Sequence, residues 1–267
     1  MKIGIIGVGN MGGAIVQGLI NSEDFNNNKL HLYNRTFTKL DKYQQDNINV
    51  HENVEEVLKE AQVIILGIKP NMYEKWLKEY SLLIQDKLFI SIGAGITSSF
   101  LSNYLKLFMI TMPNMGSQIQ KGYTVICNNS LLDIKLNEVM LEETAKIFKQ
   151  FGKVKIIEEQ EIENYIGLIG SAPAYFMELV KMMSEYFTKQ GYNLQEVEQT
   201  LAYIMETSAL IIQNNSQQNT EQLVDSVCSK GGATIEAINN MKNSSLEEIL
   251  YTSIEKCIQK AKDMKEE

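Results

Sequence analysis

Histidine, cysteine and long hydrophobic runs are scarce in this sequence of 267 residues. The only histidines are His31 and His51, and no cluster of histidine, cysteine and carboxylate has metal-site spacing, which excludes a zinc hydrolase and predicts no metal. The three cysteines are odd in number and widely spaced, so they predict neither a disulfide framework nor a zinc site, as expected in a reducing cytosol. No apolar stretch approaches the length of a membrane span, so no membrane partner is predicted.

Positive charge is also in short supply, with 25 Lys and Arg against 33 Asp and Glu and a formal net charge of −8. This balance argues against nucleic acid or an anionic membrane as the main partner and leaves small metabolites open. The chain is long enough for one large domain or two modest ones. Its start, one lysine followed by a broken apolar run, is typical of a strand rather than a signal peptide. We therefore predict a cytoplasmic protein.

A glycine-rich turn follows the first predicted strand. Residues 2–6 form a short run that is apolar after Lys2, residues 7–12 read Gly-Val-Gly-Asn-Met-Gly, and a helical pattern comes next. This order places a pyrophosphate at a helix N-terminus: Gly7 forms the turn, Gly9 lets the phosphate approach, and Gly12 packs helix on strand. The pattern predicts a Rossmann domain that binds a dinucleotide.

The end of the second predicted strand, residues 30–33, indicates which dinucleotide binds. Enzymes that prefer NAD usually carry Asp or Glu here to bind the ribose hydroxyls, whereas this chain has Asn34, Arg35 and Thr36. A guanidinium with a hydroxyl neighbour suits the 2′-phosphate of NADPH. The alternative is a surface arginine at a strand end. We predict NADPH as the preferred cofactor, with NADH possible.

Further strands are predicted at residues 63–68, 88–92, 109–112, 123–127 and 154–157. The loops that contain residues 67–70 and 93–95 come where open parallel sheets bind ligands. Everything after residue 158 has helical periodicity, with more apolar faces than one chain of this length would cover. We predict a doubly wound, mostly parallel α/β domain at residues 1–158 and an all-α dimerisation and substrate-binding domain at residues 159–267.

Residues 228–234, which read Cys-Ser-Lys-Gly-Gly-Ala-Thr, are a candidate anion site ahead of a predicted helix. Unpaired backbone N–H groups, the helix dipole and two glycines suit a carboxylate there. The hydroxyls of Ser229 and Thr234 would bind a second polar atom of the same small molecule. The alternative is a Gly-Gly turn in which Thr234 caps the helix.

Missing motifs narrow the chemistry. The sequence contains no Gly-x-Ser-x-Gly elbow and no lysine in a context typical of Schiff bases, so hydride transfer from a nicotinamide is the simplest interpretation. A substrate already activated as an iminium would need no strong protein acid, whereas ketone reduction usually calls on a His, Lys or Tyr donor.

Several motifs in order make the chain resemble the pyrroline-5-carboxylate reductase family along its whole length. They are Gly7-Val8-Gly9-Asn10-Met11-Gly12, Ile68-Lys69-Pro70, Met112-Pro113-Asn114, Gly170-Ser171-Ala172-Pro173-Ala174-Tyr175 and Ser229-Lys230-Gly231-Gly232-Ala233-Thr234. The resemblance implies reduction of 1-pyrroline-5-carboxylate to L-proline by hydride transfer from NAD(P)H, the last step of proline biosynthesis. It also implies a homodimer, or a higher oligomer built of dimers, in which each active site draws on two chains.

The resemblance also implies roles for individual residues. Those that would bind the cofactor are Ile6, Gly7, Val8, Gly9, Asn10, Met11, Gly67, Ile68, Lys69 and Pro70. Those that would bind the substrate are Glu159, Ser229, Gly231, Gly232, Ala233 and Thr234. The substrate carboxylate would rest on the Gly-Gly loop and its ring nitrogen near the Thr234 hydroxyl, which makes Thr234 and Ser229 the catalytic candidates.

The chain departs from the family pattern in four places: Ile110 replaces an Arg, Met115-Gly116 replaces Thr-Pro, Ala172 replaces a Gly, and Lys230 replaces a Pro. Ile110 removes a permanent charge and its donors, whereas Lys230 adds a cation beside the predicted anion site. Two other functions stay open: a reductase of another cyclic imine or of a hydroxy acid, and a non-catalytic regulatory paralogue. The hydroxy-acid class would need a catalytic lysine near Gly170, and none lies within ten residues.

Overall fold

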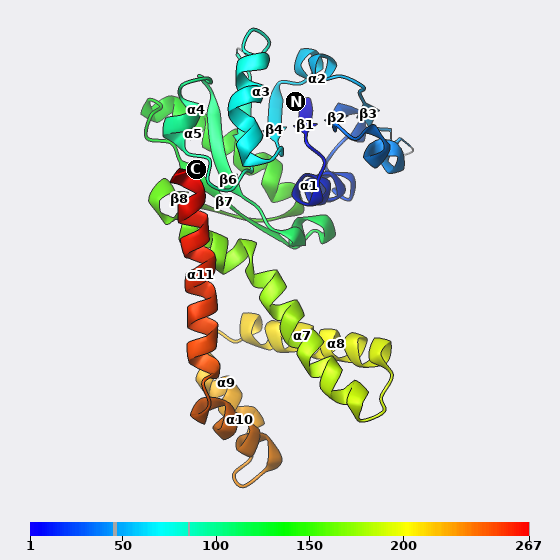
Figure 1. Cartoon of the computed structure of the whole chain (residues 1–267), viewed down its shortest axis with the longest axis vertical. Helices are drawn as coiled ribbons and strands as arrows, with labels where there is room; N and C mark the ends of the chain where they lie inside the picture. Colours follow the sequence, from blue (N-terminus) through cyan, green and yellow to red (C-terminus); the bar gives the residue numbers. More distant parts are fainter. Residues whose placement is uncertain (45–46, 85, 267) are drawn as a thin grey trace. The chain divides into compact units, whose positions relative to one another are not determined.

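The computed structural model describes residues 1–44, 47–84 and 86–266 (Figure 1). The chain forms two compact units, Met1–Ser171 with Cys257–Glu267, and Ala172–Lys256. These units and the predicted domains, residues 1–158 and 159–267, have different boundaries, and the domain boundary stays a prediction.

The first unit is built on an eight-stranded sheet in the order β3-β2-β1-β4-β5-β6-β7-β8. The strands are β1 (Ile3–Ile6), β2 (Leu30–Tyr33), β3 (Asn49–Val50), β4 (Val63–Leu66), β5 (Leu88–Ser91), β6 (Phe108–Met112), β7 (Gly122–Asn128) and β8 (Gly152–Glu158). Among these strands, β6 and β7 pair antiparallel and the other neighbours pair in parallel. The order 3-2-1-4-5-6 is that of a doubly wound nucleotide-binding sheet, so the predicted mostly parallel α/β fold is confirmed.

Helices cover both faces of the sheet and give it two separate cores. The first unit contains α1 (Asn10–Ile20), α2 (Val54–Glu60), α3 (Tyr73–Glu79), α4 (Ser98–Leu101), α5 (Ile134–Phe148) and α6 (Ile162–Tyr165). Alternate residues of β4 belong to different cores: Ile64 packs with side chains of α2 and α3, and Ile65 packs with those of α1 and α5. Because β4 is buried on both faces, its sequence is a continuous apolar run.

Short helical segments join these elements. They are the 3₁₀ segments η1 (Asn27–Lys29), η2 (Phe37–Tyr43), η3 (Pro70–Met72), η4 (Met115–Ile119), η5 (Lys149–Phe151) and η6 (Glu159–Glu161), and the π-helix η7 (Ile166–Gly170). The carboxyl ends of β1–β6, which all run in one direction, form one edge of the sheet together with the segments that follow them.

The second unit is entirely helical and has almost no core of its own. Its helices are α7 (Ala172–Lys189), α8 (Leu194–Asn214), α9 (Thr220–Val227), α10 (Ala233–Asn243) and the first part of α11 (Leu246–Glu266) (Figure 1). Asn193 caps the start of α8, since its Oδ1 accepts the N–H of Glu196 at 3.1 Å. Of residues 172–256 only Ser184 and Leu223 are buried, while Met177 is 65% exposed. Such exposed apolar faces need a second surface to cover them.

No described helix combines the length and the apolar character that crossing a membrane requires.

Candidate functional site

The carboxyl edge of the sheet brings three predicted cofactor segments together. Strands β1, β2 and β4 are in register there, with Ile6 level with Tyr33 and Leu66. The N–H of Gly7 donates to the Tyr33 carbonyl at 2.9 Å, and the N–H of Gly67 donates to the Ile6 carbonyl at 2.8 Å. The glycine turn, the loop after β2 and the loop after β4 are therefore neighbours.

Three of the glycines are needed for backbone packing. Gly7 has a φ of +97°, and a Cβ on it would come 2.6 Å from the backbone of Gly67. A Cβ on Gly67 would come 2.7 Å from the Gly7 carbonyl oxygen, and one on Gly12 would overlap that same oxygen. The turn can approach β4 and carry α1 only because these side chains are absent.

Gly9, in contrast, is not needed to avoid a clash. A Cβ on Gly9 would meet no described atom within 4 Å, and its φ of −86° is open to any residue. Gly9 is the N-cap of α1, and no side chain caps that helix end. Unpaired N–H groups and the positive end of the helix dipole thus face open space, which is the environment that a phosphate requires.

Asn34 fixes the glycine turn to the loop after β2. Its Oδ1 accepts the N–H of Val8 at 3.1 Å, and its Nδ2 donates to the Thr36 carbonyl at 2.9 Å. Arg35, between Asn34 and Thr36, is exposed. The two predicted cofactor segments are therefore held together by one side chain.

Beside this contact lies a hollow of about 470 Å³, lined by residues that include Gly9, Asn10, Lys39 and Lys42. Neither lysine was predicted as a site residue from the sequence. In the sequence they are marked only by lying four and seven residues after Arg35. The folding of η2 toward the glycine turn brings both lysines to this hollow. With Arg35, they place cations near the uncapped end of α1.

A second hollow at the same edge, about 560 Å³, joins the loop after β4 to the loop after β5. Its lining includes Lys69, Pro70, Gly95 and Met264. Gly95 has a φ of +79°, and a Cβ on it would come 2.7 Å from the Met264 carbonyl oxygen. The end of α11 therefore packs on the loop after β5, a contact between distant parts of the sequence that local patterns did not indicate.

Glu159, a predicted substrate residue, contacts this same region. Its Oε1 accepts the N–H of Ser98, the first residue of α4, at 2.8 Å. Asn114 of the Met112-Pro113-Asn114 motif also has a structural role. Its Nδ2 donates to the Ile169 carbonyl at 3.2 Å, and its Oδ1 accepts the N–H of Tyr123 at 3.0 Å. Glu159 and Asn114 thus hold backbone segments of the first unit in place.

Ile110, where the family pattern has an arginine, is 2% exposed within the apolar core of the first unit. Its surroundings offer hydrophobic packing to an aliphatic side chain, and a cation there would need a partner. An isoleucine at position 110 therefore fits its apolar surroundings.

The predicted substrate loop lies in the second unit. Gly231 has a φ of +72°, and the N–H of Gly232 donates to the Ser229 carbonyl at 2.9 Å. Gly232 is the N-cap of α10, and no side chain caps this helix. The alternative in which Thr234 caps the helix is wrong, because Thr234 is already the second helical residue. Its exposed hydroxyl has no hydrogen-bond partner among the described residues.

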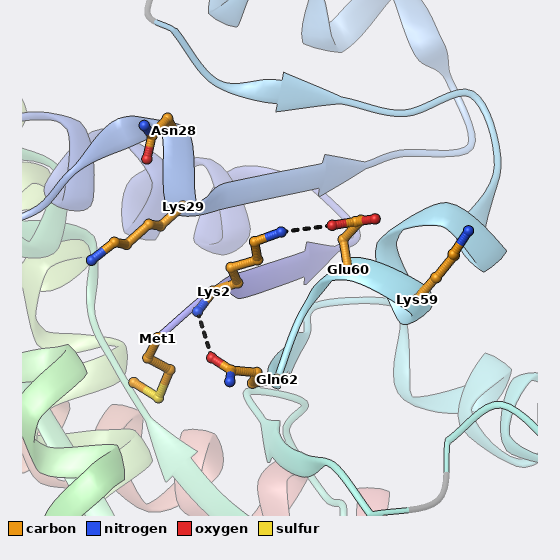
Figure 2. A pocket seen from close by; sticks show the side chains of 7 residues that line it. All are labelled: Met1, Lys2, Asn28, Lys29, Lys59, Glu60 and Gln62. Carbon is orange, nitrogen blue, oxygen red and sulfur yellow. Dashed lines mark hydrogen bonds and ion pairs between the residues drawn. The ribbon is translucent and has the colours of Figure 1, made fainter.

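A larger hollow of about 710 Å³ lies at the opposite, amino edge of the sheet (Figure 2). Figure 2 shows Lys29 and Lys59 pointing in different directions, and Lys2 Nζ is paired with Glu60 at 2.6 Å. Because these cations do not converge, the hollow lacks the arrangement that would hold an anion.

The two histidines come from β2 and from the residue that follows β3. His31 Nδ1 lies 3.0 Å from His51 Nε2, and His51 Nδ1 lies 2.9 Å from Glu56 Oε2. Burial lowers the pKa of His31, so this ring is neutral at pH 7. Among the described residues no group of His, Cys, Asp and Glu is arranged to hold a metal ion.

Comparisons with known proteins decide the family. A family model described as pyrroline-5-carboxylate reductase dimerisation matches residues 159–264, and one described as NADP oxidoreductase, coenzyme F420-dependent, matches residues 2–95. The pyrroline-5-carboxylate reductase of Escherichia coli (strain K12) is 31% identical over 271 residues, which cover 98% of each chain. This chain belongs to the pyrroline-5-carboxylate reductase family.

Solved structures agree with this assignment. The 1-pyrroline-5-carboxylate reductase of Streptococcus pyogenes is 27% identical with a TM-score of 0.84, and the match covers 98% of both chains. The Plasmodium falciparum pyrroline carboxylate reductase with NADP bound has a TM-score of 0.88 at 21% identity, covering 99% of this chain and 98% of that one, and supports the fold. The match to a dimerisation model also explains why the helices of the second unit leave apolar side chains exposed.

The open space at Gly9 leads to the first prediction. Gly9→Ala should weaken dinucleotide binding at least about tenfold, or ~1.4 kcal/mol, because the methyl occupies the space where a phosphate would approach. Its cost in stability should stay below about 1 kcal/mol, since only a glycine N-cap is lost. NADPH titration and thermal unfolding measure the two effects.

Gly67→Ala is the matched control. Its methyl meets the Gly7 carbonyl, so this variant should lower the melting temperature as well as binding. Normal NADPH binding by Gly9→Ala would contradict the phosphate site.

Proposed function

We propose that this protein reduces 1-pyrroline-5-carboxylate to L-proline by hydride transfer from NAD(P)H, with NADPH preferred over NADH. The observation that carries the proposal is the 31% identity to the Escherichia coli reductase across 98% of both chains. Reduction of another cyclic imine or of a hydroxy acid, and a purely regulatory role, are the alternatives that the experiments below separate.

The proposed cofactor site runs along the carboxyl edge of the sheet. Residues 6–11 would hold the pyrophosphate at the uncapped start of α1, and residues 67–70 would continue the site past β4. For the 2′-phosphate we propose Arg35, the only arginine in the chain, together with its neighbours Asn34 and Thr36. Lys39 and Lys42, which line the adjacent hollow, would add positive charge for the same group.

The proposed substrate site is the loop at residues 229–234. The start of α10 would bind the carboxylate through backbone N–H groups. Gly231 and Gly232 precede this helix, and Ala233 is its first residue. Ser229 would add a hydroxyl contact to the carboxylate, and the unpartnered Thr234 hydroxyl would meet the ring nitrogen. Bound NADPH supplies the hydride; the chain binds and orients the imine and keeps it beside the donor.

Glu159 remains a proposed substrate residue. Its Oε1 is engaged by the N–H of Ser98, which leaves the second carboxylate oxygen for a ligand. We further propose that each active site combines the first unit of one subunit with the helical unit of another, in a homodimer or a higher oligomer built of dimers. The cytoplasmic location stays a prediction.

A direct assay tests the activity. Purified protein incubated with 1-pyrroline-5-carboxylate and NADPH should form L-proline, identified by chiral chromatography, in amounts equal to the NADPH consumed. Oxidation of NADPH with other cyclic imines but not with this one would favour the first alternative. The absence of turnover with every imine, despite normal NADPH binding, would favour a regulatory protein.

Arg35 provides the test of cofactor preference. Arg35→Ala should raise the KM for NADPH about 10- to 100-fold, because a charged hydrogen bond to a phosphate contributes roughly 1.5 to 3 kcal/mol. Activity with NADH should change little, since NADH has no 2′-phosphate. Lys29→Ala, which removes a cation at the opposite edge of the sheet, is the control and should affect neither cofactor. Equal losses with NADPH and NADH would refute the assignment.

Thr234 and Ser229 provide the test of the substrate loop. Thr234→Ala should lower kcat/KM by about tenfold or more with NADPH binding unchanged, because the imine is then poorly oriented in the transition state. Ser229→Ala should mainly raise the substrate KM, since a carboxylate contact is the same in ground and transition states. Thr234→Ser keeps the hydroxyl and should keep most of the activity. Normal kinetics for Thr234→Ala with a lower melting temperature would assign this residue a structural role only.

A further inference from the structure

Tyr73, the first residue of α3, carries a hydroxyl into the interior of the first unit. Its side chain is 0% exposed. The hydroxyl donates to the Leu66 carbonyl at 2.6 Å and lies 3.0 Å from Ser91 Oγ. Leu66 is the last residue of β4 and Ser91 is the last residue of β5. One buried phenol therefore bridges the carboxyl ends of two neighbouring strands.

The donors and acceptors around Tyr73 allow one arrangement. A phenol has a single hydrogen, which goes to the Leu66 carbonyl because a carbonyl only accepts. The Ser91 hydroxyl must then donate to Tyr73, and Ser91 Oγ in turn accepts the N–H of Gly93 at 3.3 Å. Burial raises the pKa of the Tyr73 hydroxyl, which keeps its hydrogen in place. A directed chain thus runs from Gly93 through Ser91 and Tyr73 to Leu66.

This chain connects the two loops that share a hollow. Leu66 leads directly into residues 67–70, and Gly93 begins the loop at residues 93–95. The phenol also occupies the space beside Gly93, where a Cβ would come 2.9 Å from the Tyr73 oxygen. Thr111 on β6 donates to the Ser91 carbonyl at 3.0 Å and holds the end of β5 from its other side.

The order of strands indicates which end of the cofactor these loops would receive. Along the carboxyl edge the strands follow the order β2, β1, β4 and β5. The 2′-phosphate is assigned to the loop after β2 and the pyrophosphate to the turn after β1. At roughly 4.8 Å per strand, β5 lies about 14 Å from β2, a span that an extended dinucleotide covers. The nicotinamide end then reaches the loops after β4 and β5.

We propose that Tyr73 is a positioning residue, which sets the spacing of residues 67–70 and 93–95 and so fixes the seat of the nicotinamide end of NADPH. This inference rests on the proposed function, because that function assigns the carboxyl edge to the cofactor. Tyr73 itself touches neither cofactor nor substrate and acts through Leu66 and the Ser91–Gly93 link.

Tyr73→Phe tests this role, since it keeps the ring and removes only the hydroxyl. The variant should bind NADPH about tenfold more weakly and lose a similar factor in kcat, because a small misplacement at the reacting end is costly in the transition state. Binding of adenosine 2′,5′-bisphosphate, which lacks the nicotinamide end, should be unchanged. Calorimetric titration with both ligands measures this difference without any turnover.

Two further variants make the result specific. Ser91→Ala breaks the same chain one link further on, so it should reproduce the selective loss, and it serves as the test if Tyr73→Phe does not fold. Lys87→Met removes an amine that donates to the Ala61 carbonyl at 2.7 Å, just before the amino ends of β5 and β4, and should leave both ligands unaffected.

The proposal is overturned if Tyr73→Phe and Ser91→Ala bind NADPH normally, or if they weaken both ligands equally. A lower melting temperature with unchanged NADPH binding would likewise reduce Tyr73 to a structural role. If the proposed function fails instead, the wild-type protein would bind NADPH but form no proline. Comparing the binding of NADPH with that of adenosine 2′,5′-bisphosphate would still test the role of Tyr73.

Discussion

The close passage of two backbones, at Gly7 and Gly67, is the constraint on which the first unit depends. Neither residue can carry a Cβ where the turn after β1 meets the loop after β4. This contact keeps β1 and β4 adjacent, directs the start of α1 toward the carboxyl edge and leaves its N–H groups uncapped. Asn34 then attaches the loop after β2 to the turn, and the Tyr73 chain attaches the loop after β5 to the end of β4. Four strand ends thereby become one continuous surface for a long ligand.

The two units differ in how they bury hydrophobic surface. The sheet of the first unit is covered on both faces and has two complete cores, which give the proposed cofactor site a rigid base. The helical unit leaves most of its apolar side chains exposed, and its match to a dimerisation model identifies another subunit as the missing cover. Its stability is then linked to assembly, and so is the geometry of the proposed substrate loop at residues 229–234. This linkage explains why a reductase with a self-sufficient nucleotide domain would still act as an oligomer.

Much of this organisation follows from sequence pattern, and the exceptions have physical reasons. Apolar runs located β1, β2 and β4 to β8. In β1, β4, β5 and β6 every residue is buried, which leaves a continuous signal, whereas β8 is largely exposed. The two-residue β3 was missed, since it is too short to show alternation. The cap of α10 was misplaced because the positive φ of Gly231 lets the helix begin at Ala233, ahead of the expected threonine cap. The positions of Lys39, Tyr73 and Met264 near the proposed site depend on tertiary contacts, which a local sequence pattern does not reveal.

We propose that the cofactor lies along the carboxyl edge of the sheet and not in the larger hollow at the amino edge. Hydrogen exchange measured by mass spectrometry, with and without saturating NADPH, tests it most directly. We expect slower exchange in residues 7–13, 34–42, 67–70 and 93–95, with no change around Lys2, Asn28 and Lys59. Protection confined to the amino edge, with exchange at the glycine turn unaltered, would contradict it.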